Sequence, residues 1–223
     1  MTLPPPCCSD ASVGSKNDDV AAPEPLTRAR VVARARASIE AQGIDGLSLR
    51  AVARDLGVTA PALYAHVNSK NDLVAAVATQ YFDELVDRFE AVDTTDPIIG
   101  IRALARAYVD HALASPSLFH LLFRYPPAST GVDVPGVAAF APATRAFEVA
   151  LATTARAIEG GLLAGPDPVA AAMTMWAAVH GAAEVLLLGF AFDESAADAL
   201  VTLVIDTVIA GQVNTVHPGV ESV

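Results

Sequence analysis

Four side chains that can hydrogen-bond an anion occur close together in the N-terminal third of the chain: Arg50, Tyr64, His66 and Lys70. Contacts to DNA phosphates use donors of this kind, and an arginine can also bind guanine through two hydrogen bonds. Ordinary solvated surface residues are the alternative for each position. The residue types therefore predict contact with a nucleic acid, with Arg50 able to reach either a base or a phosphate.

A second set of residues in the same stretch is distinguished by small side chains, and comprises Ala60, Pro61, Ala62 and Ala65. A helix with small residues at its N-terminus can approach base edges in the major groove and offer methyl contact to thymine. Such a surface provides few hydrogen bonds. Sequence preference should therefore depend on Arg50 and on DNA shape.

Two short helices are needed to position these side chains. The residues LRAVARDL (49–56) and APALYAHV (60–67) fit two helices separated by a turn at Gly57. Pro61 falls in the first turn of the second helix, where proline is tolerated because that amide has no partner within the helix. The pattern predicts a helix-turn-helix at about 48–67.

Hydroxyl residues precede both short helices. Ser48 and Thr59 are expected to cap them, because a hydroxyl oxygen can accept a hydrogen bond from a first-turn amide. The same hydroxyls and helix termini can also bind a phosphate. Both residues are therefore candidates for DNA contact as well as for capping.

A helix is predicted on each side of this motif. Residues 27–42 carry apolar side chains at helical spacing and end at Gly43, and residues 70–91 form a longer helix capped by Asn68 or Ser69. Arg28, at the start of the first helix, is expected to contact the DNA backbone. Two further arginines of that helix, Arg34 and Arg36, either contact the DNA backbone together with Arg28 or form a solvated stripe.

The segment IDGLSLRAVARDLGVTAPALYAHVNSKNDL (44–73) resembles the DNA-binding domain of the TetR family, and the resemblance extends over about 27–82. Beyond a generic helix-turn-helix it has the family's Leu63-Tyr64, His66 and Ser69-Lys70 at the expected offsets. The resemblance implies phosphate contacts by Tyr64, His66 and Lys70. It also implies a regulator of transcription, most commonly a repressor, that binds double-stranded DNA and is released by a small molecule.

Composition agrees with an all-α protein that has two parts. The chain is 53% hydrophobic, and its Ala-, Val- and Leu-rich runs have helical spacing without alternation of period two. The net charge of −11 is unevenly spread, since residues 26–72 hold seven Lys and Arg against four acids and residues 73–223 hold six against seventeen. We therefore expect a basic, three-helix helix-turn-helix domain at 26–72 and a helical ligand-binding and dimerisation domain at 73–213, flanked by a disordered arm (1–25) and a frayed tail (214–223).

Beyond Pro97 the sequence predicts helices over 97–114, 117–124, 142–164, 167–190 and 195–212, with a loop over 125–141. A helix-turn-helix of this size reads two half-sites of a palindromic operator as a dimer, so we expect a homodimer. The last two helices are the candidates for its interface, because their small and branched residues allow close packing. Burial within one chain is the alternative. The small and branched residues concerned are Ala178, Val179, Ala182, Ala183, Leu186 and Leu187, then Ala197, Leu200, Val201, Val204, Ile205 and Val208.

The segment MTMWAAVHGAAEVLLLG resembles a C-terminal subfamily of TetR proteins marked by Trp176, His180 and Gly181 in this order. Met173, Trp176, His180 and Glu184 share one helical stripe, and an apolar wall with a few polar groups suits a small-molecule site. A core stripe in which His180 hydrogen-bonds Glu184 is the alternative. The main candidate ligand-binding residues are Arg106, His111, Phe123, Phe147, Met173, Trp176 and His180. Further candidates from neighbouring helices are Arg102, Tyr108, Phe119 and His120.

Other classes of function have little support in the sequence. Nucleophile elbows, phosphate loops, dinucleotide fingerprints and paired-cysteine metal sites do not occur, so we expect no enzyme activity, cofactor or metal. Cys7 and Cys8 are adjacent and cannot form a disulfide framework, which fits a cytoplasmic protein. Residues 169–192 approach transmembrane length, but His180 and Glu184 in mid-span favour a buried helix and no membrane. A helical small-molecule-binding protein or enzyme without DNA function remains the alternative.

Overall fold

The computed structural model describes residues 25–120, 140–165, 167–190 and 192–213. Apart from an isolated bridge between Leu163 and Val213, these residues contain no strand, and the predicted all-α fold is confirmed. In chain order their helices are α1 (Arg28–Gly46), α2 (Leu49–Asp55), α3 (Ala60–Tyr64), α4 (Lys70–Glu90), α5 (Pro97–Ala114), α6 (Pro116–Phe119), α7 (Ala141–Glu159), α8 (Pro168–Leu187) and α9 (Glu194–Gln212).

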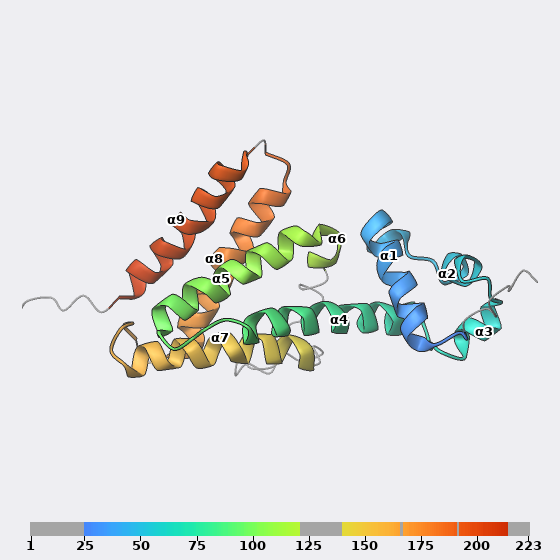
Figure 1. Cartoon of the computed structure of the whole chain (residues 1–223), viewed down its shortest axis with the longest axis horizontal. Coiled ribbons are helices and arrows are strands. Elements are labelled where there is room, and N and C mark those ends of the chain that lie inside the picture. The colour runs from blue at the N-terminus through green and yellow to red at the C-terminus, as the bar shows by residue number, and fades with distance from the viewer. Residues whose placement is uncertain (1–24, 121–139, 166, 191, 214–223) are drawn as a thin grey trace, which may run out of the picture.

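The helices form two groups, which we call the head (α1–α3) and the body (α4–α9). Figure 1 shows the head at one end of the molecule, with α4 running from it into the body, where α5 and α7 lie against α4. Helix α8 packs on α5 and α7, and α9 packs on α8. Head and body also meet where α6 contacts α1, and there the Ser117 hydroxyl donates to the backbone oxygen of Glu40 at 3.2 Å.

Aspartate caps start three helices of the body. Asp96, Asp167 and Asp193 each accept a hydrogen bond from an amide in the first turn of α5, α8 and α9. A carboxylate in this position satisfies a donor that has no partner within the helix. Pro97 and Pro168 follow two of these caps, at the position where a missing amide has least effect.

Glycines in the left-handed region end two helices. Gly57 has φ +69°, and the amide after it bonds to the carbonyl of Ala53 at 2.9 Å, which closes the end of α2. Gly161 has φ +71° and ends α7 in the same way, with the amide of Leu162 bonded to the carbonyl of Ala157 at 2.9 Å. Because of this turn, α7 is shorter than the helix predicted over 142–164.

Several local predictions need correction. Ser48 lies at the N-cap of α2, but its hydroxyl accepts no hydrogen bond from that helix, whereas Thr59 caps α3 as expected. Helix α3 ends before residue 67 because two successive amides, those of His66 and Val67, both bond to the carbonyl of Leu63.

Other helix ends also differ from the predicted ones. Helix α1 continues beyond a break at Gly43 (φ +72°), and α8 ends before Gly189 (φ +81°). The helix predicted over 117–124 is described only to residue 120, and α6 ends one residue earlier. The rest of that prediction, and the loop predicted over 125–141 except for its last residues, lie outside the described residues.

The core follows the inward face of α4. Five side chains spaced one turn apart along it are buried, namely Leu73, Val77, Tyr81, Leu85 and Phe89. In the described part of the chain, α8 is the only helix long and apolar enough to cross a membrane, and 33% of its apolar window is buried. It packs against α5, α7 and α9, which accounts for part of its apolar surface and leaves the rest exposed.

Candidate DNA-binding surface and ligand pocket

Helix α3 presents small side chains and one tyrosine to solvent. Leu63 is fully buried and fastens the helix to the head, whereas Pro61, Tyr64 and Ala65 are exposed, with 54% of Tyr64 accessible. Thr59 starts the helix by accepting a hydrogen bond from the amide of Ala62 at 3.4 Å. The outer face of α3 can therefore approach a groove closely, and Tyr64 supplies the main hydrogen-bonding group on it.

Three polar side chains near α3 are available for an external partner. In the part of the chain that the structure describes, Arg50 and Lys70 form no hydrogen bond or ion pair, and Arg50 is exposed. The Ser48 hydroxyl is exposed and free of the helix it precedes. Arg50 lies in α2 and Lys70 begins α4, the helices before and after α3 in the chain.

Arg28 has partners within the molecule. Its guanidinium donates to the backbone oxygen of His66 at 2.7 Å and forms an ion pair with Asp72 at 2.8 Å. The hydrogen bond from Arg28, supported by one from the amide of Asn68, lowers the pKa of Asp72 to about 2. Arg28 therefore joins the start of α1 to the junction between α3 and α4.

The other arginines predicted to be either DNA contacts or a solvated stripe are also paired. Arg34 forms an ion pair with Asp55 of α2, and Arg36 forms ion pairs with Glu40 of its own helix and Glu84 of α4. These pairs fasten α1 to its neighbours. Because Glu84 lies outside residues 26–72, its pair with Arg36 makes the head less positive than the charge count over those residues indicates.

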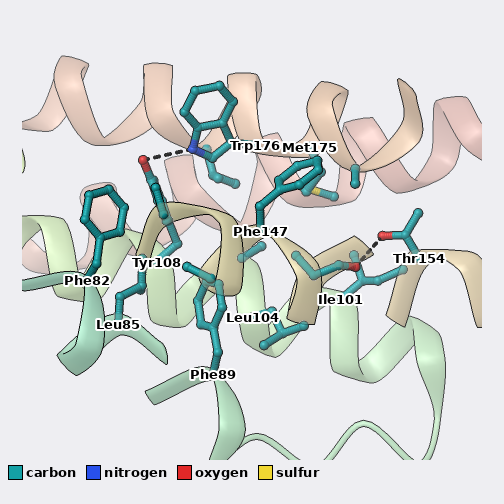
Figure 2. A pocket seen from close by; sticks show the side chains of 16 residues that line it. Phe82, Leu85, Phe89, Ile101, Leu104, Tyr108, Phe147, Thr154, Met175 and Trp176 are labelled. Carbon is teal, nitrogen blue, oxygen red and sulfur yellow. Dashed lines mark hydrogen bonds between the residues drawn. The ribbon is translucent and has the colours of Figure 1, made fainter. Parts of the chain in front are cut away.

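An apolar pocket lies between four helices of the body (Figure 2). Its cavity measures about 80 Å³, and a water molecule needs roughly 10–15 Å³, so it has room for a small organic molecule. The lining residues come from α4 (Phe82, Leu85, Phe89), α5 (Ile101, Leu104, Ala105, Tyr108), α7 (Ala143, Ala146, Phe147, Ala150, Thr154) and α8 (Ala172, Met175, Trp176, Val179).

Tyr108 forms the polar end of this pocket. Its hydroxyl accepts a hydrogen bond from Trp176 Nε1 at 3.1 Å and shares another with His180 Nδ1 at 2.6 Å (Figure 2 shows the first). Burial raises the pKa of Tyr108 and lowers the pKa of His180, so both groups are neutral near pH 7. The predicted hydrogen bond between His180 and Glu184 is not formed, because Nε2 and Oε1 are 3.9 Å apart.

The structure separates the residues predicted to bind a ligand. Phe147 and Trp176 line the pocket, and His180 reaches it through Tyr108. Arg106 and Met173 do not line it: Arg106 is paired with Asp198, and Met175 takes the place predicted for Met173. His111 lies elsewhere in the core, and Phe123 lies outside the described residues.

Sequence reasoning missed the contribution of α4. Phe82, Leu85 and Phe89 form one wall of the pocket. The helical spacing of Leu85 and Phe89 indicates only a core-facing stripe, and Phe82 lies outside that stripe. Leu104 of α5 and Met175 of α8 were also missed. The usable signal was the run of aromatic residues on α4 opposite Phe147 and Trp176.

His111 joins α4 to α5 through a reciprocal contact with Tyr81. The Tyr81 hydroxyl donates to the backbone oxygen of His111 at 3.2 Å, and His111 Nε2 bonds to the backbone oxygen of Tyr81 at 3.0 Å. The two rings stack with their centroids 4.1 Å apart. The pair therefore fixes the spacing of α4 and α5 next to the pocket.

Three apolar side chains on α8, directly after it or on α9 are exposed, namely Val185, Leu188 and Leu203, with Leu188 69% and Leu203 64% accessible. Of the residues predicted for a homodimer interface, five are buried within the chain: Val179, Ala182, Ala183, Val201 and Ile205. Burial within one chain thus accounts for these five, and a partner could cover only the outer faces of the two helices.

Two family models match this chain, one over the head and the start of α4 and the other over the body. Residues 31–77 match the family model described as bacterial regulatory proteins of the tetR family, and residues 101–208 match the model described as a tetracyclin repressor-like C-terminal domain. The chain belongs to the TetR family of transcriptional regulators. In the residues described for this TetR-family chain, no group of three or more His, Cys, Asp or Glu could hold a metal ion.

The relatives of this TetR-family regulator include proteins matched over nearly the whole chain. An uncharacterised HTH-type transcriptional regulator of Mycobacterium tuberculosis is 29% identical over 214 residues, covering 94% of this chain and 92% of its own. A protein of unknown function from Rhodococcus is 28% identical with a TM-score of 0.71, over 85% of this chain and 96% of that one. A TetR variant from Acinetobacter baumannii in complex with minocycline shares the fold, at 22% identity and a TM-score of 0.61 over 84% of this chain and 96% of that one.

Proposed function

We propose that this TetR-family chain is a cytoplasmic repressor that binds a palindromic DNA operator as a homodimer and leaves it when a small molecule occupies the pocket. The observation that carries the proposal is the continuity of α4. This one helix begins with Lys70 beside α3 and lines the pocket with Phe82, Leu85 and Phe89. A ligand that changes the packing of these three side chains therefore shifts α4 and, through Lys70, the neighbouring helix α3.

The proposed DNA contacts divide between α3 and its neighbours. The small outer residues of α3, Ala60, Pro61, Ala62 and Ala65, enter the major groove, and Tyr64, His66, Lys70, Ser48 and Thr59 contact phosphates. Arg50 reaches a base edge. Arg28 acts indirectly, because its partners hold α1 against the junction that positions α3.

The operator test uses a gel shift with the DNA upstream of the chain's own gene. The wild-type protein should give a discrete complex, and a block substitution of the palindrome should abolish it. Arg50→Ala should relax the preference for the operator, whereas Lys70→Ala should weaken binding to all sequences alike. Equal binding of the wild-type protein to operator and scrambled DNA would refute the proposal.

The homodimer is proposed to form through the outer faces of α8 and α9, because Leu188 and Leu203 there are more than 60% accessible and helices with exposed apolar side chains pair into bundles. Sedimentation of Leu203→Glu should then show a monomer. Ile99→Glu is the matched control, since Ile99 is 61% accessible but lies on α5, outside the proposed interface. A dimeric Leu203→Glu protein would contradict this interface.

A further inference from the structure

We infer that the pocket takes a small, uncharged and mainly apolar ligand whose single hydrogen-bonding group faces Tyr108. The inference rests on the proposed function, in which this pocket is the effector site. It concerns the chemical class of the effector, which follows from what the lining offers and from what it lacks.

The lining offers no charge to a ligand. In the described part of the chain, every residue that lines the pocket is apolar or aromatic except Thr154 and Tyr108. An ion moved from water into such a site loses its hydration and gains no partner, which is strongly unfavourable. A carboxylate, phosphate or ammonium group is therefore excluded from the cavity.

Four of the five arginines on the surrounding helices have partners elsewhere, and the fifth, Arg88 of α4, is exposed and does not line the pocket. Arg102 and Arg106 of α5 pair with Asp206 and Asp198 of α9. On α7, Arg145 pairs with Asp83, and Arg156 donates to the backbone oxygen of Thr94 at 2.9 Å. None of these four cations lines the pocket, so none can neutralise an acidic ligand there.

The two hydroxyl groups of the lining differ in the hydrogen-bonding positions that they leave free for a ligand. The Thr154 hydroxyl already donates to the backbone oxygen of Ala150 at 2.9 Å (Figure 2). Tyr108 has one hydrogen-bonding position left after its bonds to Trp176 and His180, because a neutral phenol has one donor and two acceptor sites. One polar group on the ligand can be satisfied at this end of the pocket.

Trp176 provides the assay, because it is the only tryptophan in the sequence and lines the pocket. Its fluorescence should be followed near pH 7.5, without DNA, while the wild-type protein is titrated with 1-octanol, octanoate or octylammonium. These probes share a chain length and differ in charge. We expect saturable binding of octanol, with both ions binding at least about tenfold more weakly.

Two variants locate the polar end. Tyr108→Phe removes one hydroxyl and should weaken octanol binding about three- to tenfold. Thr154→Val is the matched control and should change it less than about twofold, because that hydroxyl is already bonded. The charge comparison uses only wild-type protein, so it remains decisive if Tyr108→Phe does not fold.

The outcomes separate the ligand class from the function. Octanoate or octylammonium binding as tightly as octanol, or no saturable response to octanol, would overturn the inference. If Thr154→Val weakens octanol binding as much as Tyr108→Phe does, the placement of the ligand's hydrogen-bonding group at Tyr108 would be overturned. Octanol binding that leaves operator affinity unchanged would support the ligand class and count against the proposed release mechanism.

Discussion

His111 is a buried histidine whose protonation should destabilise the protein in mild acid. Burial, aided by the charges of Arg88 and Arg36, lowers its pKa to about 4, although the hydrogen bond to the Tyr81 backbone and the charge of Glu84 oppose the shift. In the unfolded chain the pKa returns to about 6.5. Between these values the unfolded state binds a proton that the folded state does not, so the free energy of unfolding falls as the pH is lowered.

The size of the effect follows from the two pKa values. Stability from neutral His111 is fully present above about pH 6.5 and is lost as the pH falls toward about 4. The difference of about 2.5 pKa units corresponds to about 3 kcal/mol in total, and to about 2 kcal/mol between about pH 7.5 and 5. A loss of this size is a large part of the stability of a typical domain.

Urea unfolding at these two pH values, at one protein concentration, measures the loss. The matched variant is His111→Gln, which keeps a side-chain N–H to donate to the Tyr81 carbonyl but does not titrate. Between about pH 7.5 and 5, the free energy of unfolding of this variant should fall by about 2 kcal/mol less than that of the wild-type protein. His180, whose pKa is also lowered by burial, contributes equally to both proteins. Identical pH dependence of the two would refute the reasoning.

Three further predictions concern the head and the pocket. Gly57→Ala should lower the free energy of unfolding by about 1–2 kcal/mol because of the positive φ, and Gly57→Asn by less, as urea unfolding would show. Arg28→Met should raise the pKa of Asp72 from about 2 toward its usual value in an NMR titration, and an unchanged pKa would contradict the ion pair. Phe147→Ala should enlarge the pocket and cost about 3 kcal/mol of stability in urea unfolding, whereas a cost under about 1 kcal/mol would place Phe147 elsewhere.

The elements of the head could be predicted because their signals are local. A cap, a proline and a glycine within a few residues of each other define α2 and α3, and Gly57 adopts the left-handed conformation that the turn requires. The same reasoning failed for Ser48, since the residue type favours a cap but does not determine where the hydroxyl points.

The pocket wall on α4 could not be predicted in the same way. Leu85 and Phe89 have the spacing of a core-facing stripe, and periodicity identifies an inward face without telling what lies opposite it. His180 shows the same limit. Glu184 is one turn away in sequence, but its carboxylate lies 3.9 Å from Nε2, and the ring forms a hydrogen bond through Nδ1 to Tyr108 of another helix. Pairings of this kind depend on tertiary packing.

The internal ion pairs of α1 have a consequence for how the protein finds its operator. Arg28, Arg34 and Arg36 are each bound to an acidic partner, whereas Arg50 of the head and Lys70 at the start of α4 form no hydrogen bond or ion pair among the described residues. Each phosphate neutralised by a protein cation releases counterions and contributes about −0.9 to the slope of log K against log salt. In the proposed homodimer, where Lys70 of each subunit contacts a phosphate and Arg50 a base edge, these cations should give a slope of about −2. Binding should therefore tolerate changes in ionic strength, and few copies of the protein should be held on unrelated chromosomal DNA.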